Sequence, residues 1–131
     1  MKQKNILLLG IVMAATAVIL GAFGAHGLKK IVTPEQLDVF KTGVQYQFYH
    51  ALGIIIAAII GQQIEHNLIK RAAWLFLFGI IAFSGSLYAM TLFYALNTEG
   101  VKWIGAITPV GGLLFILGWI ILGLGISKNQ N

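Results

Sequence analysis

Charged residues and cysteine are the two kinds of residue that this sequence most lacks. Only 10% of its 131 residues are charged and 58% are apolar, whereas roughly 25% of the residues in a soluble domain are charged. Such a chain cannot cover a water-facing surface with polar groups, so the composition indicates a membrane protein. The absence of cysteine excludes disulfide bonds, thiolate metal ligands, a cysteine nucleophile and lipidation of a cysteine.

Four apolar stretches are long enough to cross a bilayer as helices, for which roughly 20 residues are needed. None of them contains Asp, Glu, Lys or Arg, and the connections between them are short. The sequence therefore predicts an all-α integral membrane fold, a four-transmembrane-helix bundle formed by residues 1–131 as a single domain. The predicted spans are Ile6 to Ala25, Val44 to Ile64, Ala72 to Leu96 and Trp103 to Ile126.

The first span has a second interpretation as a secretory signal peptide. Lys2 and Lys4 precede an apolar run that ends in small residues, as they would in such a peptide. Cleavage would leave three spans, and we expect the first helix to be retained.

The nine basic residues outnumber the four acidic ones, but they are scattered between the apolar runs. Pairs such as Lys29 with Lys30 and Lys70 with Arg71 are typical of helix ends held at the membrane surface, so we predict no nucleic-acid partner. With four crossings, five basic residues share the side of the termini and four share the other side. This small excess favours both termini in the cytoplasm.

The second span is predicted to begin as an amphipathic helix before it enters the hydrocarbon. Thr33 to Gln36 combines a capping hydroxyl, a proline at the first helical position and a glutamine three residues after the cap. The apolar residues that follow recur every three or four positions, as on one helix face, and a bend is expected near Gly43. These residues are Leu37, Phe40, Val44 and Phe48.

Small residues form stripes along three of the spans. Helices in a bilayer associate through close backbone contact, which requires such residues. One interpretation is that the stripes pack the helices within one bundle. The alternative is that they form an interface between copies of the chain, and we expect a homo-oligomer of unspecified subunit number. The predicted packing residues are Gly10, Ala14, Ala17, Gly21, Gly24, Gly53, Ala57, Gly61, Gly111, Gly118 and Gly125.

Polar side chains of the spans fall in one half of the membrane, the half that adjoins the first loop. Buried polar groups need partners, so we expect a shared network. One interpretation is that these groups join helices and form an aromatic belt; the other is that they line a site for a lipid headgroup, proton or small ligand, with His50 as its main residue. The candidate ligand-binding residues are His26, Tyr46, His50, Ser84, Tyr88 and Thr108.

Pro109 is the irregular position of the fourth span. A proline obstructs the preceding helical turn, so the helix either begins at Pro109, with Thr108 as its cap, or is broken there. In the first case Trp103 to Ile107 forms an interfacial turn, and in the second the freed backbone groups could bind an ion or substrate.

The sequence gives little support to metal, cofactor or enzymatic chemistry. The spans contain no carboxylate and no histidine pair at helical spacing. Haem between His26 and His50 is the strongest cofactor hypothesis, but it requires both rings to converge, and we predict no cofactor. Without a nucleophile elbow or a nearby acid, Ser84 and Ser86 do not indicate a hydrolase, and we predict no enzyme.

Four sequence blocks, in order, resemble a small membrane family called domain of unknown function 423, which includes bacterial inner-membrane proteins and the animal transmembrane protein 256. The resemblance covers essentially the whole chain and implies a four-helix protein of the bacterial inner membrane without an established biochemical role. It assigns no catalytic residue. The blocks are Gly21 to Leu28, Gln45 to Leu52, Phe83 to Tyr88, and Ile107 to Gly112 with Gly118-Trp119.

The leading hypothesis from the sequence is a membrane protein that binds a lipid headgroup or another small polar molecule in its polar half. One alternative is a channel or transporter subunit for protons or small solutes, which would need a continuous polar path. The other is a scaffold or assembly partner in a larger membrane complex, which would use the glycine stripes.

Overall fold

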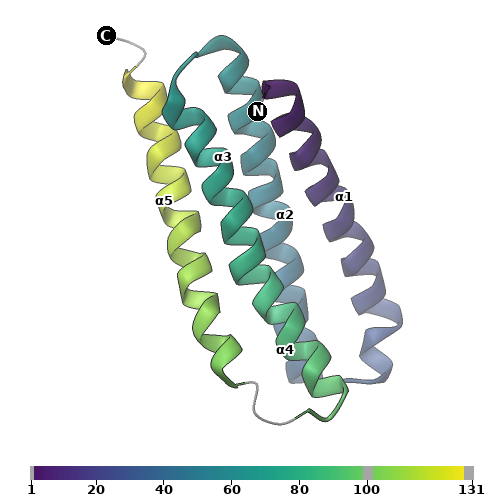
Figure 1. Cartoon of the computed structure of the whole chain (residues 1–131). Helices are drawn as coiled ribbons and strands as arrows, with labels where there is room; N and C mark the ends of the chain where they lie inside the picture. The colour runs from purple at the N-terminus through teal and green to yellow at the C-terminus, as the bar shows by residue number, and fades with distance from the viewer. Residues whose placement is uncertain (1, 99–101, 129–131) are drawn as a thin grey trace.

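A computed structural model describes residues 2–98 and 102–128 of the chain. Within these residues every regular element is helical, and the helices run up and down beside one another (Figure 1). The α-helices are α1 (Gln3–His26), α2 (Pro34–Gln63), α3 (Asn67–Gly79), α4 (Gly85–Ala95) and α5 (Ile107–Ser127). The shorter elements are the 3₁₀ helices η1 (Leu28–Lys30) and η3 (Lys102–Ala106) and the π-helical turn η2 (Ile80–Ser84).

Four helical segments are long and apolar enough to cross a membrane, as the sequence predicts. The third consists of α3, η2 and α4 in one continuous run. Both termini and the connection between α2 and α3 lie at one end of the bundle, here called the terminal end; the opposite end is called the loop end (Figure 1). The four segments are Gln3–Lys30, Pro34–Gln63, Asn67–Ala95 and Lys102–Ser127.

The start of α2 confirms the predicted amphipathic helix. The side-chain oxygen of Thr33 accepts from the Gln36 backbone N–H at 3.4 Å, and the Gln36 side chain accepts from the Thr33 N–H at 3.1 Å. This reciprocal pair satisfies two N–H groups that the first helical turn leaves without partners. Phe40 is buried while Glu35 and Asp38 are exposed, and α2 continues as an α-helix beyond the predicted bend at Gly43.

The helices form a flattened bundle in which α2 has a central place. α1 packs chiefly against α2, and α5 packs chiefly against α3 and η2. Figure 1 accordingly shows α1 and α5 at the two outer edges. In the most apolar 18-residue stretch of α2, 44% of the residues are buried, whereas the corresponding stretch of the segment Gln3–Lys30 has 17% of its residues buried. Residues of α1 and α5 at the same depth are therefore separated by the inner helices.

Phe76 on α3 lies at the centre of the apolar core and is fully buried. A Cβ added at Gly53 on α2 would come within 3.0 Å of its ring, and one at Gly118 on α5 within 2.6 Å. The ring thus fills the space that two glycines leave open. The buried core also includes Ile6, Ile54, Ala57, Ala58, Ile69, Ala72, Ala73, Ile80, Phe115 and Leu122.

The glycines of the predicted stripes face neighbouring helices of the same chain. A Cβ at Gly10 would meet Ile55 of α2, and one at Gly125 would meet Ile69 of α3. This agrees with the interpretation that the stripes pack one bundle. The homo-oligomer stays a prediction.

The π-helical turn η2 was not predicted from the sequence. It lies opposite Gly111 of α5, where a Cβ would meet the backbone of Phe83. A π-turn widens the helix locally, and the missing side chain at Gly111 leaves room for that wider backbone.

The start of α5 corrects the prediction at Pro109. The helix begins at Ile107, with Ala106 as its N-cap and no side-chain capping bond, so Thr108 is not the cap. Pro109 lies in the first turn, where backbone N–H groups have no partner within the helix, and it does not break α5. Trp103 lies in η3 and is largely exposed, consistent with the predicted interfacial turn.

Candidate functional site

Gln47 joins three helices by hydrogen bonds in the half of the bundle nearer the loop end. Its side-chain amide donates to the Met13 carbonyl and to the Thr16 hydroxyl of α1, each at 2.9 Å. Its carbonyl oxygen accepts from the Tyr88 hydroxyl of α4 at 2.8 Å. Gln47 is only 4% exposed. The hydrocarbon of a membrane offers no hydrogen-bond partners, so these bonds within the bundle satisfy its side-chain amide.

His50 lies one helical turn from Tyr46 and belongs to an aromatic cluster. Its ring stacks on Phe115 of α5, with centroids 3.4 Å apart. Its Nδ1 lies 2.7 Å from the Tyr46 carbonyl. A carbonyl can only accept, so Nδ1 carries a proton and Nε2 is the acceptor of the neutral ring. Tyr46 in turn packs against Phe83, with centroids 4.7 Å apart.

A third polar contact joins α4 to α5. The Ser86 hydroxyl donates to the Phe83 carbonyl at 2.8 Å and lies 2.7 Å from the Thr108 hydroxyl. Because the single Ser86 proton is used, Thr108 is the donor in the second bond. Ser84, in the adjacent turn, is fully buried, and its hydroxyl has no partner in the structure.

His26 lies apart from these contacts. It is exposed at the end of α1, and its Nδ1 bonds the Ala22 carbonyl of the same helix at 3.0 Å. The six predicted residues therefore do not converge on one pocket, because α1 and α5 occupy opposite edges of the bundle. His50 with Tyr46, Tyr88 with Gln47, and Thr108 with Ser86 form three separate contacts.

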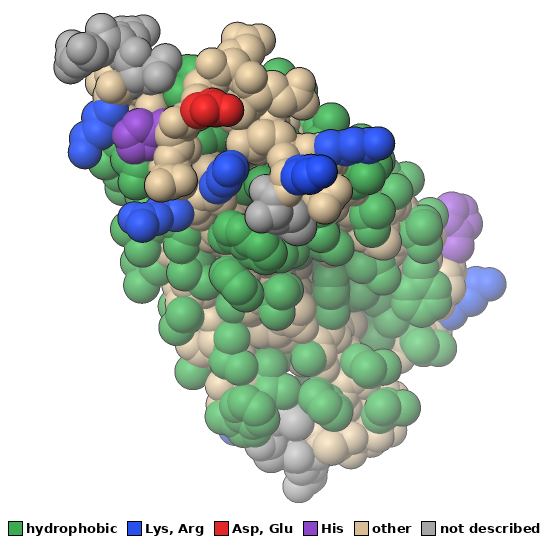
Figure 2. Space-filling view, turned by 45° about the horizontal axis from the view of Figure 1, so that its top comes forward, with side chains coloured by type: hydrophobic (Ala, Val, Ile, Leu, Met, Phe, Trp, Pro, Cys, Tyr) green, Lys and Arg blue, Asp and Glu red, His purple; other side chains and the backbone are tan. Residues whose placement is uncertain are grey.

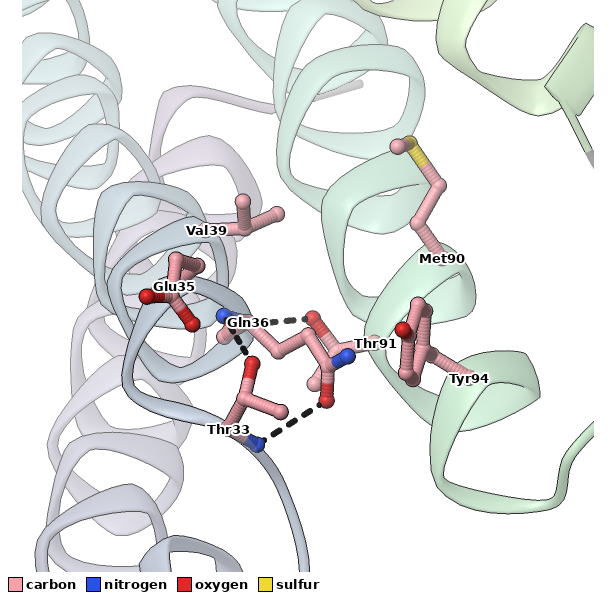
Figure 3. Close-up of a pocket in the computed structure, with 7 residues that line it drawn as sticks. All are labelled: Thr33, Glu35, Gln36, Val39, Met90, Thr91 and Tyr94. Atoms are coloured by element: carbon pink, nitrogen blue, oxygen red, sulfur yellow. Dashed lines mark hydrogen bonds between the residues drawn. The ribbon is translucent and has the colours of Figure 1, made fainter.

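A cavity of about 430 Å³ opens between the start of α2 and the end of α4, at the loop end. In Figure 3, Met90 and Tyr94 of α4 lie across from Val39 and Gln36 of α2. The Thr91 hydroxyl has one proton, which it donates to the Leu87 carbonyl of its own helix at 3.0 Å or shares with the Gln36 carbonyl of α2, which lies 3.5 Å away. The lining residues are Thr33, Glu35, Gln36, Val39, Met90, Thr91 and Tyr94.

A smaller groove of about 220 Å³ borders the same helix contact and has an apolar wall. Tyr88 is the only one of the six predicted site residues that lines either of these two cavities. The groove is lined by Leu20, Phe23, Leu28, Ile31, Phe40, Tyr88, Thr91, Leu92 and Ala95.

Sequence reasoning did not place Gln47 or Glu35 in the site. A glutamine within an apolar span signals a need for partners, and this signal could have identified Gln47. Glu35 and Gln36 were interpreted only as part of a helix start, and their position beside Tyr94 depends on how α2 and α4 pack.

Comparison with known proteins identifies the family of this chain. The family described as "Protein of unknown function (DUF423)" matches residues 20–112. The chain belongs to this family. It is also 42% identical over 126 residues to the UPF0382 membrane protein SSP2132 of Staphylococcus saprophyticus, a match that covers 96% of this chain and 99% of that protein.

The UPF0382 membrane protein YwdK of Bacillus subtilis is likewise 42% identical over 127 residues, covering 96% of this chain and 98% of that protein. No solved structure matches the chain. These relatives confirm the resemblance found in the sequence, and with the four apolar helices they identify a multi-pass membrane protein. The DUF423 match includes every residue that lines the 430 Å³ cavity.

Proposed function

We propose that this protein binds a lipid headgroup, or another small amphipathic molecule, in the cavity between α2 and α4. The observation that carries the proposal is the composition of the wall. Val39 and Met90 supply an apolar surface, while Glu35, Gln36 and the Tyr94 hydroxyl supply polar groups. Binding sites for small molecules commonly combine a mainly apolar wall with a few polar groups that orient the ligand.

The depth of the cavity supports a membrane-derived ligand. It lies at the loop end of the bundle, where Tyr94 is 60% and Trp103 66% exposed. Exposed tyrosine and tryptophan are typical of the zone of lipid headgroups. A molecule in this cavity would therefore have its polar part at the level of the headgroups.

The channel hypothesis receives less support from the packing. Toward the terminal end, apolar side chains such as Ile54, Ile69 and Phe76 fill the described interior of the bundle. A path for protons or solutes through one copy would have to cross that core. Proton flux into liposomes that disappears in His50→Ala would favour the channel; leakage equal to that of empty vesicles would remove it.

A scaffold role is the remaining alternative. The glycine stripes that would form such an interface pack against helices of the same chain. A stable partner protein after mild detergent extraction would nevertheless favour this role.

Photo-crosslinking tests the proposed site directly. The purified chain would be irradiated in vesicles containing a phospholipid with a photoreactive group beside its headgroup, and the labelled peptides would be identified by mass spectrometry. We expect labelling to concentrate on residues 33–39 and 90–94. Labelling spread evenly over the lipid-facing surfaces of α1 and α5 would contradict the proposal.

We further propose that the protein lies in the bacterial inner membrane with both termini in the cytoplasm. The terminal end has five basic residues, and among the described residues of that end Glu65 is the one acidic residue. The basic residues are Lys2, Lys4, Lys70, Arg71 and Lys128. Figure 2 shows this concentration of basic side chains on the terminal end. The loop end has four basic residues and, among its described residues, Glu35 and Asp38. Cytoplasmic sides carry the excess of Lys and Arg.

A further inference from the structure

Another cavity, of about 230 Å³, lies at the terminal end, the opposite end of the bundle from the cavity between α2 and α4. It is formed where the start of α1, the end of α2 and the start of α3 meet. Most of its lining is polar: it consists of Gln3, Gly61, Glu65, His66, Asn67 and Lys70.

Gln3, one of the lining residues, has an unsatisfied acceptor. Its Oε1 is buried and has no hydrogen-bond partner in the structure. A Cβ at Gly61 would lie 2.7 Å from the Gln3 amide carbon, so the carboxamide fits against the α2 backbone only because residue 61 is glycine. A buried acceptor without a partner is costly, and a ligand that donates a hydrogen bond would remove that cost.

Donors line the same cavity. The His66 Nδ1 accepts from the Leu68 backbone N–H at 3.2 Å, so the proton of the neutral ring is on Nε2. Lys70 adds an ammonium group, and the N-terminus of the long α3 helix adds a partial positive charge. Glu65 supplies a carboxylate as a further acceptor. A complementary ligand would therefore have an anionic group and, a few bonds away, a hydrogen-bond donor.

We propose that this cavity binds a phospholipid headgroup whose tip donates hydrogen bonds, as phosphoethanolamine and phosphoglycerol do. The phosphate binds Lys70 and the His66 Nε2–H, and the ammonium or hydroxyl tip donates to Gln3 Oε1 and Glu65. Phosphocholine has the same phosphate but no donor at its tip, so it leaves Gln3 Oε1 unsatisfied. This site is independent of the cavity between α2 and α4.

The test measures the affinity of the full-length protein in detergent for short-chain phosphatidylethanolamine, phosphatidylglycerol and phosphatidylcholine. The loss of one hydrogen bond to a buried acceptor corresponds to about a tenfold difference in affinity. We expect at least one of the two donor lipids to bind about tenfold more tightly than phosphatidylcholine. Equal affinities of the unmodified protein for all three lipids would by themselves overturn the proposal.

Two variants assign the preference to the cavity. Gln3→Met keeps the length of the side chain and removes the acceptor, so it should abolish the preference for donor lipids. Lys70→Met, at an exposed position, should weaken the binding of all three lipids. Gln62→Met is the matched control, because Gln62 is exposed at the same end outside the lining. A preference retained in Gln3→Met would overturn the proposal.

A competition arm identifies the source of the ligand. Displacement of bound lipid by soluble glycerophosphoethanolamine, but not by glycerophosphocholine, would support the site and show that the headgroup alone suffices. Failure of both to compete, with the lipid preference intact, would support a site that requires a membrane-held headgroup. Equal competition by both soluble compounds would contradict the proposed role of the donor tip.

Discussion

The imidazole of His50 lies flat on the ring of Phe115, with the ring planes 6° apart and the centroids separated by 3.4 Å. This stack joins α2 to α5, two helices with few other contacts. These contacts explain the burial of the His50 side chain, because its ring packs on Phe115 and its Nδ1–H is bonded to the Tyr46 carbonyl.

The first prediction separates the stack from that hydrogen bond. His50→Ala removes both and should lower the free energy of unfolding by about 2–4 kcal/mol, as other truncations of buried rings do. His50→Phe retains an aromatic ring and should cost less than half as much. Thermal unfolding in detergent measures both variants, and equal losses would show that the ring contact contributes little.

The second prediction concerns the bonds of Gln47. Tyr88→Phe removes one bond between helices and should cost about 0.6 kcal/mol, the average for such bonds in a membrane protein. Gln47→Leu removes all three bonds of the Gln47 amide and leaves the buried end of the Tyr88 side chain without its partner, so it should cost more. A double-mutant cycle measures the coupling of Gln47 with Tyr88, and zero coupling would exclude an energetic role for the 2.8 Å bond.

The third prediction uses two glycines of α5 that differ in their surroundings. A Cβ at Gly118 would lie 2.6 Å from the Phe76 ring, whereas one at Gly123 would meet nothing within 4 Å. Gly118→Ala should therefore destabilise the bundle by about 1–3 kcal/mol, the usual cost of overpacking. Gly123→Ala should be neutral or slightly stabilising. Equal effects on the unfolding temperature would contradict the predicted packing at Phe76.

The fourth prediction tests the orientation of the chain. The protein has no cysteine, so a single introduced thiol gives an unambiguous label. In intact cells, a membrane-impermeant maleimide should label Lys30→Cys at the loop end and leave Lys128→Cys at the terminal end unlabelled. Labelling of Lys128→Cys alone would reverse the orientation.

Much of the fold could be predicted because it depends on local sequence. The apolar runs predict four membrane-crossing segments, and Thr33 with Gln36 fixes the start of α2. The turn at η2 could not be predicted, because it depends on the contact between Phe83 and Gly111.

The candidate site was less predictable because the sequence gives the depth of a residue but not its lateral position. His26 and Thr108 were placed at similar depth, yet α1 and α5 lie at opposite edges of the bundle. The cavity instead brings Glu35 and Gln36 of α2 beside Tyr94 of α4. This proximity could be predicted only if it were known which helix packs beside the start of α2.

Retention of lipid by two variants with the same substitution tests the central claim most directly. Val39→Phe fills the cavity between α2 and α4, whereas Val110→Phe adds the same ring at a site that is 54% exposed on α5. Native mass spectrometry after mild detergent extraction would count the lipid molecules that each purified protein retains. The proposal predicts that Val39→Phe loses a lipid that both the unmodified protein and Val110→Phe keep; equal retention by all three would contradict it.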